Sequence, residues 1–149
     1  MTKNEIILAN QECLFPSVFH YFKEPLVLVR AKDQYVWDAD GNQYLDFFGG
    51  ILTVSVGHCN DRVNKALHAQ IDTLQHVSTL FATEPQAALA RKISDIAPGP
   101  GWKSFFTSSG TEANETAILA ARCYTGSSEI IALRHAYHGR SALAMGIGG

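Results

Sequence analysis

The residues whose types and spacing are best suited to bind a ligand form a short turn, Ser109-Gly110-Thr111. This turn lies between the apolar pair Phe105-Phe106 and a helical pattern. The first N–H groups of a helix lack partners within the helix and, with the positive end of the helix dipole, attract anions. Gly110 has no Cβ, so a phosphate can approach the backbone there. Ser109 and Thr111 can add hydroxyl donors. The turn therefore predicts a phosphate-binding site.

The same turn has a second interpretation that needs no ligand. Ser109 and Glu112 stand three residues apart, the spacing of a capping box, in which side chains satisfy the free N–H groups at the start of a helix. The spacing is compatible with both a phosphate site and a plain helix cap.

A second loop, residues 134–140, follows the apolar run 129–133 and contains Tyr137 and His138. Ligands of open α/β sheets bind at the carboxyl edge of the strands, where this loop and the Ser-Gly-Thr turn are both predicted to lie. An exposed aromatic ring beside an anion site suits a phosphorylated flat heterocycle. His135 and His138 form a poor metal pair, because no carboxylate or cysteine stands close to them in sequence. We expect no metal.

The elements that position these loops form a strand, turn, helix, strand pattern, with strands at 103–107 and 129–133 and a helix at 112–124. This order is typical of an α/β fold with a parallel sheet. Two strands alone do not make a stable sheet. We therefore expect residues 101–149 to be the truncated start of a larger α/β domain.

The preceding sequence predicts a scaffold. Residues 26–47 contain three short strand patterns with Asp40-Gly41 at a tight turn, which indicates an antiparallel meander. Amphipathic helices are expected at about 61–76, capped by Asn60, and after Thr83, with a capping box to Gln86. The predicted division is an N-terminal segment with the meander at 1–60, connecting helices at 61–100 and the truncated domain at 101–149.

Composition narrows the class of partner. The chain has 149 residues, a net charge of −2 and 46% hydrophobic residues, and it has no basic stripe, so neither nucleic acid nor a membrane surface is an expected partner. The apolar stretch near the start, Ile6 to Ala9, is too short for a signal-peptide core or a membrane span. The three cysteines lack a C-x-x-C pattern and are expected to be partly buried thiols. A cytoplasmic or mitochondrial-matrix location follows as a prediction.

Five ordered motifs carry a family resemblance, and they occupy residues 38–47, 57–59, 83–86, 105–113 and 137–140. In this order and spacing they resemble the landmarks of class III aminotransferases, which are pyridoxal-phosphate enzymes of fold type I. The resemblance covers nearly the whole chain from about Leu14, and residues 47–59 are most similar to the alanine–glyoxylate aminotransferase 2 branch. One departure is Asn60-Asp61, where family members usually have His-Pro.

The resemblance implies the large domain of a fold type I transferase, here incomplete and preceded by the meander. It implies that Gly110 and Thr111 donate backbone N–H groups to the phosphate of pyridoxal 5′-phosphate, that Ser109 assists, that Tyr137 stacks on the ring, and that His138 lies beside it. Two further segments match stretches that lie near the substrate in the family. Gly50, Ile51 and Leu52 match a loop that borders the substrate, and Thr79, Leu80 and Phe81 match a stretch near the active site of the neighbouring subunit in a homodimer. Ordinary packing explains both segments equally well.

A transaminase also needs a lysine that binds the cofactor covalently and a carboxylate on its pyridine nitrogen. None of the six lysines is a convincing candidate, because even Lys103 opens a strand whose far end, about 15 Å away, carries the phosphate turn. We therefore assign no catalytic residue to this chain and expect the Schiff-base lysine beyond residue 149. The resemblance implies ping-pong transfer of an amino group from an amino acid or amine to an oxo acid of the glyoxylate or pyruvate type, with the fragment inactive alone.

Four alternatives remain open. Amine phospho-lyases belong to the same branch, and glutamate-semialdehyde-type aminomutases share the Ser-Gly-Thr turn and the Tyr-His-Gly loop. The segment that precedes Gly57 is closer to the transaminases than to the mutases. A non-enzymatic phosphate-binding relic, or an incomplete gene product, is the alternative from another class.

Overall fold

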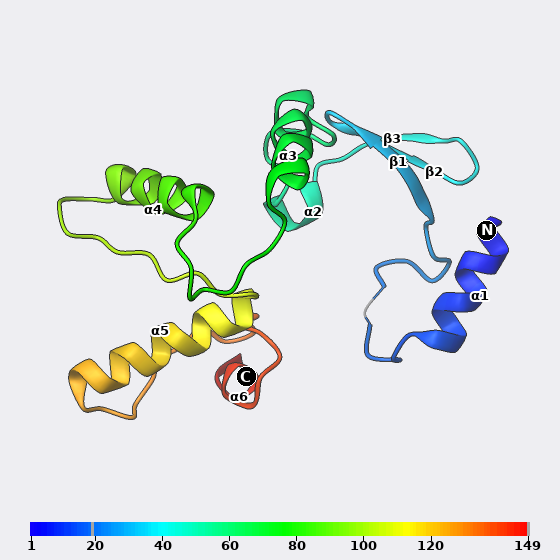
Figure 1. Ribbon diagram of the computed structural model, residues 1–149. Helices are drawn as coiled ribbons and strands as arrows, with labels where there is room; N and C mark the ends of the chain where they lie inside the picture. The colour runs from blue at the N-terminus through cyan, green and yellow to red at the C-terminus, as the bar shows by residue number, and fades with distance from the viewer. Residues whose placement is uncertain (19, 149) are drawn as a thin grey trace. The chain divides into compact units, whose positions relative to one another are not determined.

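The computed structural model of the protein describes residues 1–18 and 20–148. The chain forms two compact units, Met1–Ser78 and Thr79–Gly149, whose elements are drawn in Figure 1. The division predicted at residues 60 and 100 stays a prediction.

The first unit begins with helix α1, Lys3–Cys13. A capping box starts it: the Thr2 hydroxyl accepts from the Glu5 N–H at 3.3 Å, and the Glu5 carboxylate accepts from the Thr2 N–H at 2.7 Å. This helix was not predicted from the sequence.

The meander predicted for residues 26–47 is confirmed. Strands β1, Leu28–Lys32, β2, Tyr35–Asp38, and β3, Gln43–Leu45, form an antiparallel sheet in the order β1-β2-β3. Gly41 has φ +88° in the turn between β2 and β3, a backbone conformation that favours glycine.

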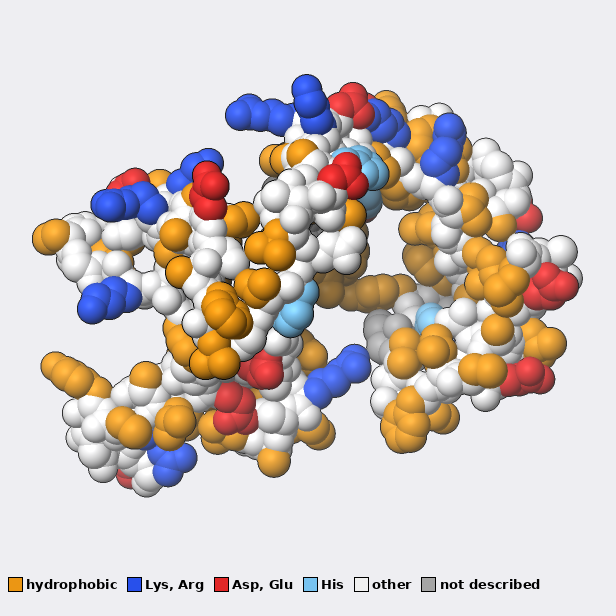
Figure 2. All heavy atoms as spheres, viewed as in Figure 1, with side chains coloured by type: hydrophobic (Ala, Val, Ile, Leu, Met, Phe, Trp, Pro, Cys, Tyr) orange, Lys and Arg blue, Asp and Glu red, His pale blue; other side chains and the backbone are white. Residues whose placement is uncertain are grey.

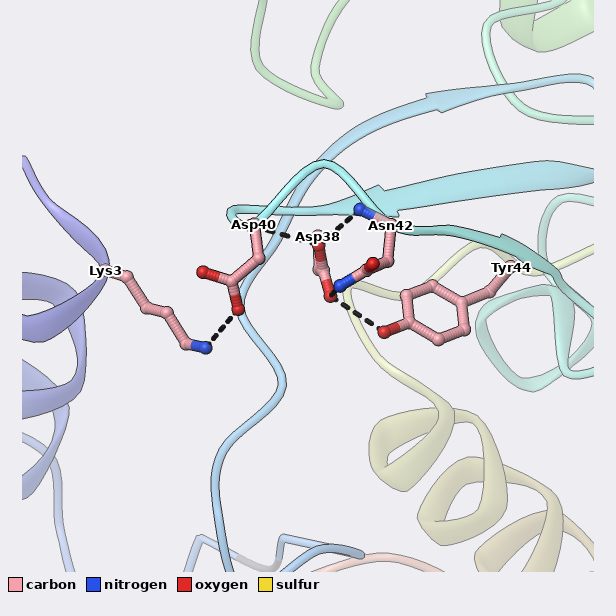
Figure 3. Close-up of polar contacts among 5 residues, drawn as sticks. All are labelled: Lys3, Asp38, Asp40, Asn42 and Tyr44. Atoms are coloured by element: carbon pink, nitrogen blue, oxygen red, sulfur yellow. Dashed lines mark hydrogen bonds and ion pairs between the residues drawn. The ribbon is translucent and has the colours of Figure 1, made fainter.

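Asp38 organises the end of this hairpin (Figure 3). Its carboxylate is only 5% exposed and accepts four hydrogen bonds: from the Asp40 N–H at 3.0 Å, from Asn42 through its N–H at 2.8 Å and its Nδ2 at 3.0 Å, and from the Tyr44 hydroxyl at 2.7 Å. The donors stabilise the charged form, those of Asn42 most strongly, so the pKa of Asp38 falls from 3.8 to about 2. Lys3 forms an ion pair with Asp40 beside this cluster.

Helix α3, Asp61–Thr73, completes the regular structure of the first unit, after the short turn α2, Gly49–Leu52. The Asn60 side chain accepts from the Arg62 and Val63 N–H groups, as predicted for an N-cap. The helix ends three residues before the predicted position because Leu74 adopts an extended conformation, φ −162° and ψ 112°.

The second unit contains three helices: α4, Glu84–Ile96, α5, Gly110–Thr125, and α6, Ala142–Gly148. The capping box predicted between Thr83 and Gln86 is wrong, since Thr83 is the N-cap residue but its side chain makes no cap hydrogen bond. Pro85 occupies the second helical position, so one of the N–H groups that a cap would satisfy is missing. In Figure 1 the segment after α5 runs back towards the start of that helix.

The two strands predicted in this unit are wrong for the part of the chain that the structure describes, because 103–107 and 129–133 have no regular secondary structure. A strand exists only when a neighbour accepts and donates its backbone hydrogen bonds, and these segments have no such neighbour among the described residues. Their apolar side chains stay exposed, 77% for Phe105, 101% for Ile131 and 79% for Leu133. Hydrophobic side chains accordingly show at many places on the surface in Figure 2.

Buried apolar residues are correspondingly few among the described residues: Val27 and Val36 in the first unit and Ala144 in the second. No helix in the described ranges combines the length and the apolar character that crossing a membrane requires. The three cysteines are free and exposed, so the predicted partial burial of these thiols is wrong.

Candidate functional site

The start of α5 carries the Ser-Gly-Thr turn, and the predicted alternative, a helix cap, is present there. The Ser109 hydroxyl accepts from the Glu112 N–H at 3.2 Å. The Glu112 carboxylate in turn accepts from the N–H of Ser108 at 2.8 Å and contacts the Ser109 hydroxyl at 3.4 Å. This cap fixes the direction in which the chain enters the helix.

The cap leaves unbonded the two N–H groups that could bind an anion. Those of Gly110 and Thr111 make no hydrogen bond with any described residue, since the cap uses the N–H groups of Ser108 and Glu112. A Cβ placed on Gly110 would meet nothing within 4 Å, so the space beside its backbone is open. Two free amides at the positive end of a helix, with open space before them, suit a phosphate group. The helix cap therefore does not block the predicted phosphate site.

Thr111 adds a hydroxyl whose proton is available. Its Oγ1 accepts from the Arg140 N–H at 3.3 Å. A hydroxyl has one proton and two lone pairs, so the Arg140 contact uses a lone pair and leaves the proton free to be donated. The Ser109 hydroxyl, by contrast, already contacts the Glu112 carboxylate.

The loop that carries Tyr137 is attached to the same end of α5. The Asn114 Nδ2 donates to the His138 carbonyl at 2.7 Å, across 24 positions in the sequence. Gly139 packs so tightly on Thr111 that a Cβ there would lie 2.5 Å from Oγ1, and its φ of +132° also requires glycine. The structure thus brings the predicted loop to the predicted turn.

The two predicted ring-contacting residues differ in exposure. The Tyr137 side chain is 77% exposed, which leaves its ring free to stack on a flat ligand. The His138 Nε2 is buried and has no hydrogen-bond partner among the described residues. An unsatisfied buried polar atom is costly, so this nitrogen is suited to a group that the described residues do not supply.

The predicted substrate-side residues Gly50, Ile51 and Leu52 belong to the first unit and form a strained turn. All three have left-handed backbone angles, with φ +60°, +61° and +64°. For the two residues with a Cβ this costs roughly 1–2 kcal/mol each. Their side chains are exposed, 74% for Ile51 and 79% for Leu52. Strain of this size at an exposed apolar turn is typical of a functional segment.

Asp46 and His58 hold this strained turn in place. Asp46 Oδ1 accepts from the Phe48 and Gly49 N–H groups at 2.8 and 2.9 Å, and Oδ2 lies 2.6 Å from His58 Nε2. The bond to His58, followed by those to Gly49 and Phe48, lowers the pKa of Asp46. The Gly57-His58-Cys59 motif is therefore structural.

Gly57 is required at this corner by a close backbone approach. His58 exchanges two backbone hydrogen bonds with Asp33, at 2.7 and 2.8 Å, and a Cβ on Gly57 would lie 3.1 Å from the Asp33 Cα. The Lys32 Nζ then donates to the Cys59 carbonyl at 2.9 Å and to Asp61 at 2.8 Å, although Asn60-Asp61 departs from the usual family pair.

The remaining predicted residues, Thr79, Leu80 and Phe81, lie in an exposed turn ahead of α4. Among the described residues no group of three or more His, Cys, Asp or Glu side chains could hold a metal ion. Sequence reasoning missed Asn114 and the Asp46–His58 pair. The sequence carried only a weak signal for Asn114: asparagine has a low helix propensity, so its presence within a helical pattern is unusual.

Residues 20–149 match the aminotransferase class-III family. The chain is 42% identical to human mitochondrial alanine–glyoxylate aminotransferase 2 over 144 residues. This alignment covers 97% of this chain and 28% of that protein. It is 39% identical to the acetylornithine aminotransferase of Methanothermobacter thermautotrophicus, over 95% of this chain and 35% of that protein. The chain thus spans about a third of the length of these relatives.

Solved structures agree with the family. An (S)-enantioselective omega-transaminase from Thermomicrobium roseum matches all of this chain with a TM-score of 0.85 and 35% identity, over 36% of that chain. A taurine:2-oxoglutarate aminotransferase from Bifidobacterium kashiwanohense, in complex with PLP and glutamate, matches 97% of this chain and 32% of its own with a TM-score of 0.84 and 28% identity.

An Arthrobacter phospholyase in complex with phosphoethanolamine matches 95% of this chain and 33% of its own with a TM-score of 0.85 and 27% identity. The predicted fold, the start of a fold type I transferase, is confirmed by these structures. The match of residues 20–149 and the order of the motifs lead to one conclusion: this chain belongs to the class III aminotransferase family.

Proposed function

We propose that residues 109–111 and 137–138 form part of the pyridoxal-phosphate site of a transaminase. The observation that carries this proposal is the pair of free N–H groups of Gly110 and Thr111, which stay open although the helix is capped. Family membership supports the same cofactor, because a structural relative is a complex with PLP.

Each residue of the site has a defined task. The Gly110 and Thr111 N–H groups and the Thr111 hydroxyl donate to the phosphate, and Ser109 assists by capping the helix that presents them. Tyr137 stacks on the ring, and His138 lies at its edge with a nitrogen available for a further polar group. When bound, pyridoxal phosphate supplies an aldehyde that takes up an amino group and a ring that withdraws electrons from it.

The proposed reaction is ping-pong transfer of an amino group from an amino acid or amine to an oxo acid of the glyoxylate or pyruvate type. We place the covalently binding lysine outside residues 1–149 and propose that these residues alone are inactive. The turn Gly50–Leu52 and the segment Thr79–Phe81 are proposed to border the substrate, the latter across a homodimer interface. The proposed location is the cytoplasm or the mitochondrial matrix.

The test measures cofactor binding and turnover with the complete natural polypeptide that contains these residues. We expect it to bind pyridoxal phosphate, with a shifted absorbance spectrum, and to form an oxo acid from an amino donor. The 149-residue chain is expected to give neither turnover nor a borohydride-trappable cofactor bond. Turnover by the 149-residue chain would contradict the placement of the lysine.

A second candidate activity is elimination of phosphate from a phosphorylated amine, favoured by the likeness to the Arthrobacter phospholyase. Phosphoethanolamine as the only substrate separates the two activities, because a phospho-lyase releases inorganic phosphate without an oxo-acid acceptor. Phosphate release without an acceptor would replace the transaminase proposal but leave the cofactor site intact. Absence of pyridoxal-phosphate binding in the complete polypeptide would favour a phosphate-binding relic.

A further inference from the structure

Asn114 lies on the helix that carries the proposed phosphate site. It stands four residues after Gly110 in α5, so the two residues share one face of the helix. Its side chain is half-buried and donates to the His138 carbonyl at 2.7 Å. The first turns of α5 therefore carry both the free N–H groups proposed for a phosphate and the side chain that holds the loop with Tyr137.

Three contacts attach this loop to α5, and all involve residues just after Tyr137. Besides the Asn114 bond, the Arg140 N–H donates to Thr111 Oγ1 at 3.3 Å, and Gly139 packs directly on the Thr111 side chain. Of these two hydrogen bonds, the one from Asn114 is the shorter, and its donor is a side chain whereas the donor of the other is the Arg140 backbone.

The Tyr137 ring itself has little packing that could fix its position, because the side chain is 77% exposed. Its place relative to the Gly110 and Thr111 N–H groups therefore depends on the backbone on either side of it. The preceding residue, Ala136, bonds to the Leu133 carbonyl of its own loop, and the printed bonds to α5 come from the residues that follow. A rigid ligand with a phosphate and a ring gains from both anchors only when their spacing matches its own.

We propose that Asn114 is a positioning residue, which sets the spacing between the phosphate site and the stacking ring by holding the His138 carbonyl. This inference rests on the proposed function of residues 109–111 and Tyr137. It adds a residue that touches no ligand atom and acts through Tyr137.

The test compares a ligand that uses both anchors with one that uses only the phosphate site, in the complete natural polypeptide. 4′-Deoxypyridoxine 5′-phosphate carries the ring and the phosphate but no aldehyde, so its binding needs no lysine. Inorganic phosphate is the second probe. We expect Asn114→Ala to raise the Kd of the first probe about tenfold and that of inorganic phosphate less than about twofold.

Thr116→Ala is the matched control, since Thr116 is a half-buried neutral residue of the same helix with no role in either anchor. It should change neither Kd by more than about twofold. Asn114→Asp gives an independent variant that keeps the side-chain shape and replaces the donor by an acceptor. Its charge weakens both probes, but the ratio of the two Kd values should rise as in Asn114→Ala.

A double-mutant cycle separates positioning from general support of the helix. If Asn114 acts through Tyr137, Asn114→Ala should have almost no further effect on the first probe in a Tyr137→Ala background. Additive effects, or an equal loss of both probes in Asn114→Ala, would overturn the inference while leaving the phosphate site in place. If the unmodified polypeptide bound neither probe, both the proposed function and this inference would be wrong.

Discussion

The two units satisfy their polar groups in different ways. In the first unit the Asp38 carboxylate accepts four hydrogen bonds from Asp40, Asn42 and Tyr44, and every donor comes from the same hairpin. In the second unit the N–H groups of Gly110 and Thr111 remain open beside an otherwise complete helix cap.

This difference distinguishes a structural polar cluster from a binding site. A buried charge surrounded by donors from its own chain has no capacity left for a ligand, and it contributes to folding. Open donors beside unfilled space contribute little to folding and are available to a ligand. The comparison therefore predicts that mutations in the two clusters affect different properties.

The largest effect is expected from Gly110→Asp. A carboxylate at this position repels the phosphate, and we expect the Kd for pyridoxal phosphate to rise on the order of 100-fold. Thermal stability should hardly change, because the side chain enters open space. Equilibrium titration and thermal unfolding measure the two properties. Ser128→Asp, with the same charge beyond the other end of α5, is the control, and equal effects of both variants would refute the comparison.

Asp38→Asn is expected to show the opposite pattern. Asparagine has one acceptor oxygen and an NH2 group that only donates, so it cannot accept all four hydrogen bonds that the two Asp38 oxygens accept. The hairpin therefore loses hydrogen bonds, and the Tm should fall by about 5–10 °C. The affinity for pyridoxal phosphate should not change. Asp40→Asn, which breaks only the exposed pair with Lys3, should lower the Tm by less than about 2 °C. A fall as large as that of Asp38→Asn would show that general charge matters more than the cluster.

Acid should affect the same hairpin. Because the donors of Asn42 and Tyr44 hold the pKa of Asp38 at about 2, below its ordinary value of 3.8, the stabilisation is complete above about pH 3.8. It is lost as the pH falls through about 2. The hydrogen-exchange protection factors of the Asn42 and Tyr44 amides, which correct for the intrinsic pH dependence of exchange, should fall across this range. Asp38→Asn should lack the transition. An unchanged transition in that variant would assign the acid sensitivity to another group.

The smallest effect concerns the strained turn of the first unit. Ile51→Gly removes the Cβ from a left-handed position and is expected to stabilise the protein by up to about 1 kcal/mol. Ile71→Gly, the same change inside the right-handed helix α3, should destabilise it by about 1 kcal/mol. Chemical denaturation measures both. A loss of stability in Ile51→Gly would show that this side chain packs against a partner.

Most elements governed by local sequence were predictable, although the capping box expected between Thr83 and Gln86 does not form. The Asp40-Gly41 turn, the Asn60 cap and the Ser109–Glu112 pair all depend on residues within four positions of each other, and each is present. Helix α1 could have been found by the same rule, since Thr2 and Glu5 form a capping box.

Features that depend on distant residues could not be predicted in this way. The patterns at 103–107 and 129–133 indicate segments that could form strands if partner strands were present. No partner strand lies beside them among the described residues. The Asn114–His138 bond spans 24 positions, and the Asp46–His58 pair spans 12. Periodicity and capping rules do not report contacts across such distances.

The exposed segments 103–107 and 129–133 also have a consequence for biosynthesis. In the longer polypeptide that we propose, Phe105, Ile131 and Leu133 leave the ribosome before the residues beyond position 149. The nascent chain then displays them on segments without regular secondary structure. Such segments readily associate with copies of themselves. The yield of folded protein should therefore depend on translation speed and on holdase chaperones that cover these two segments.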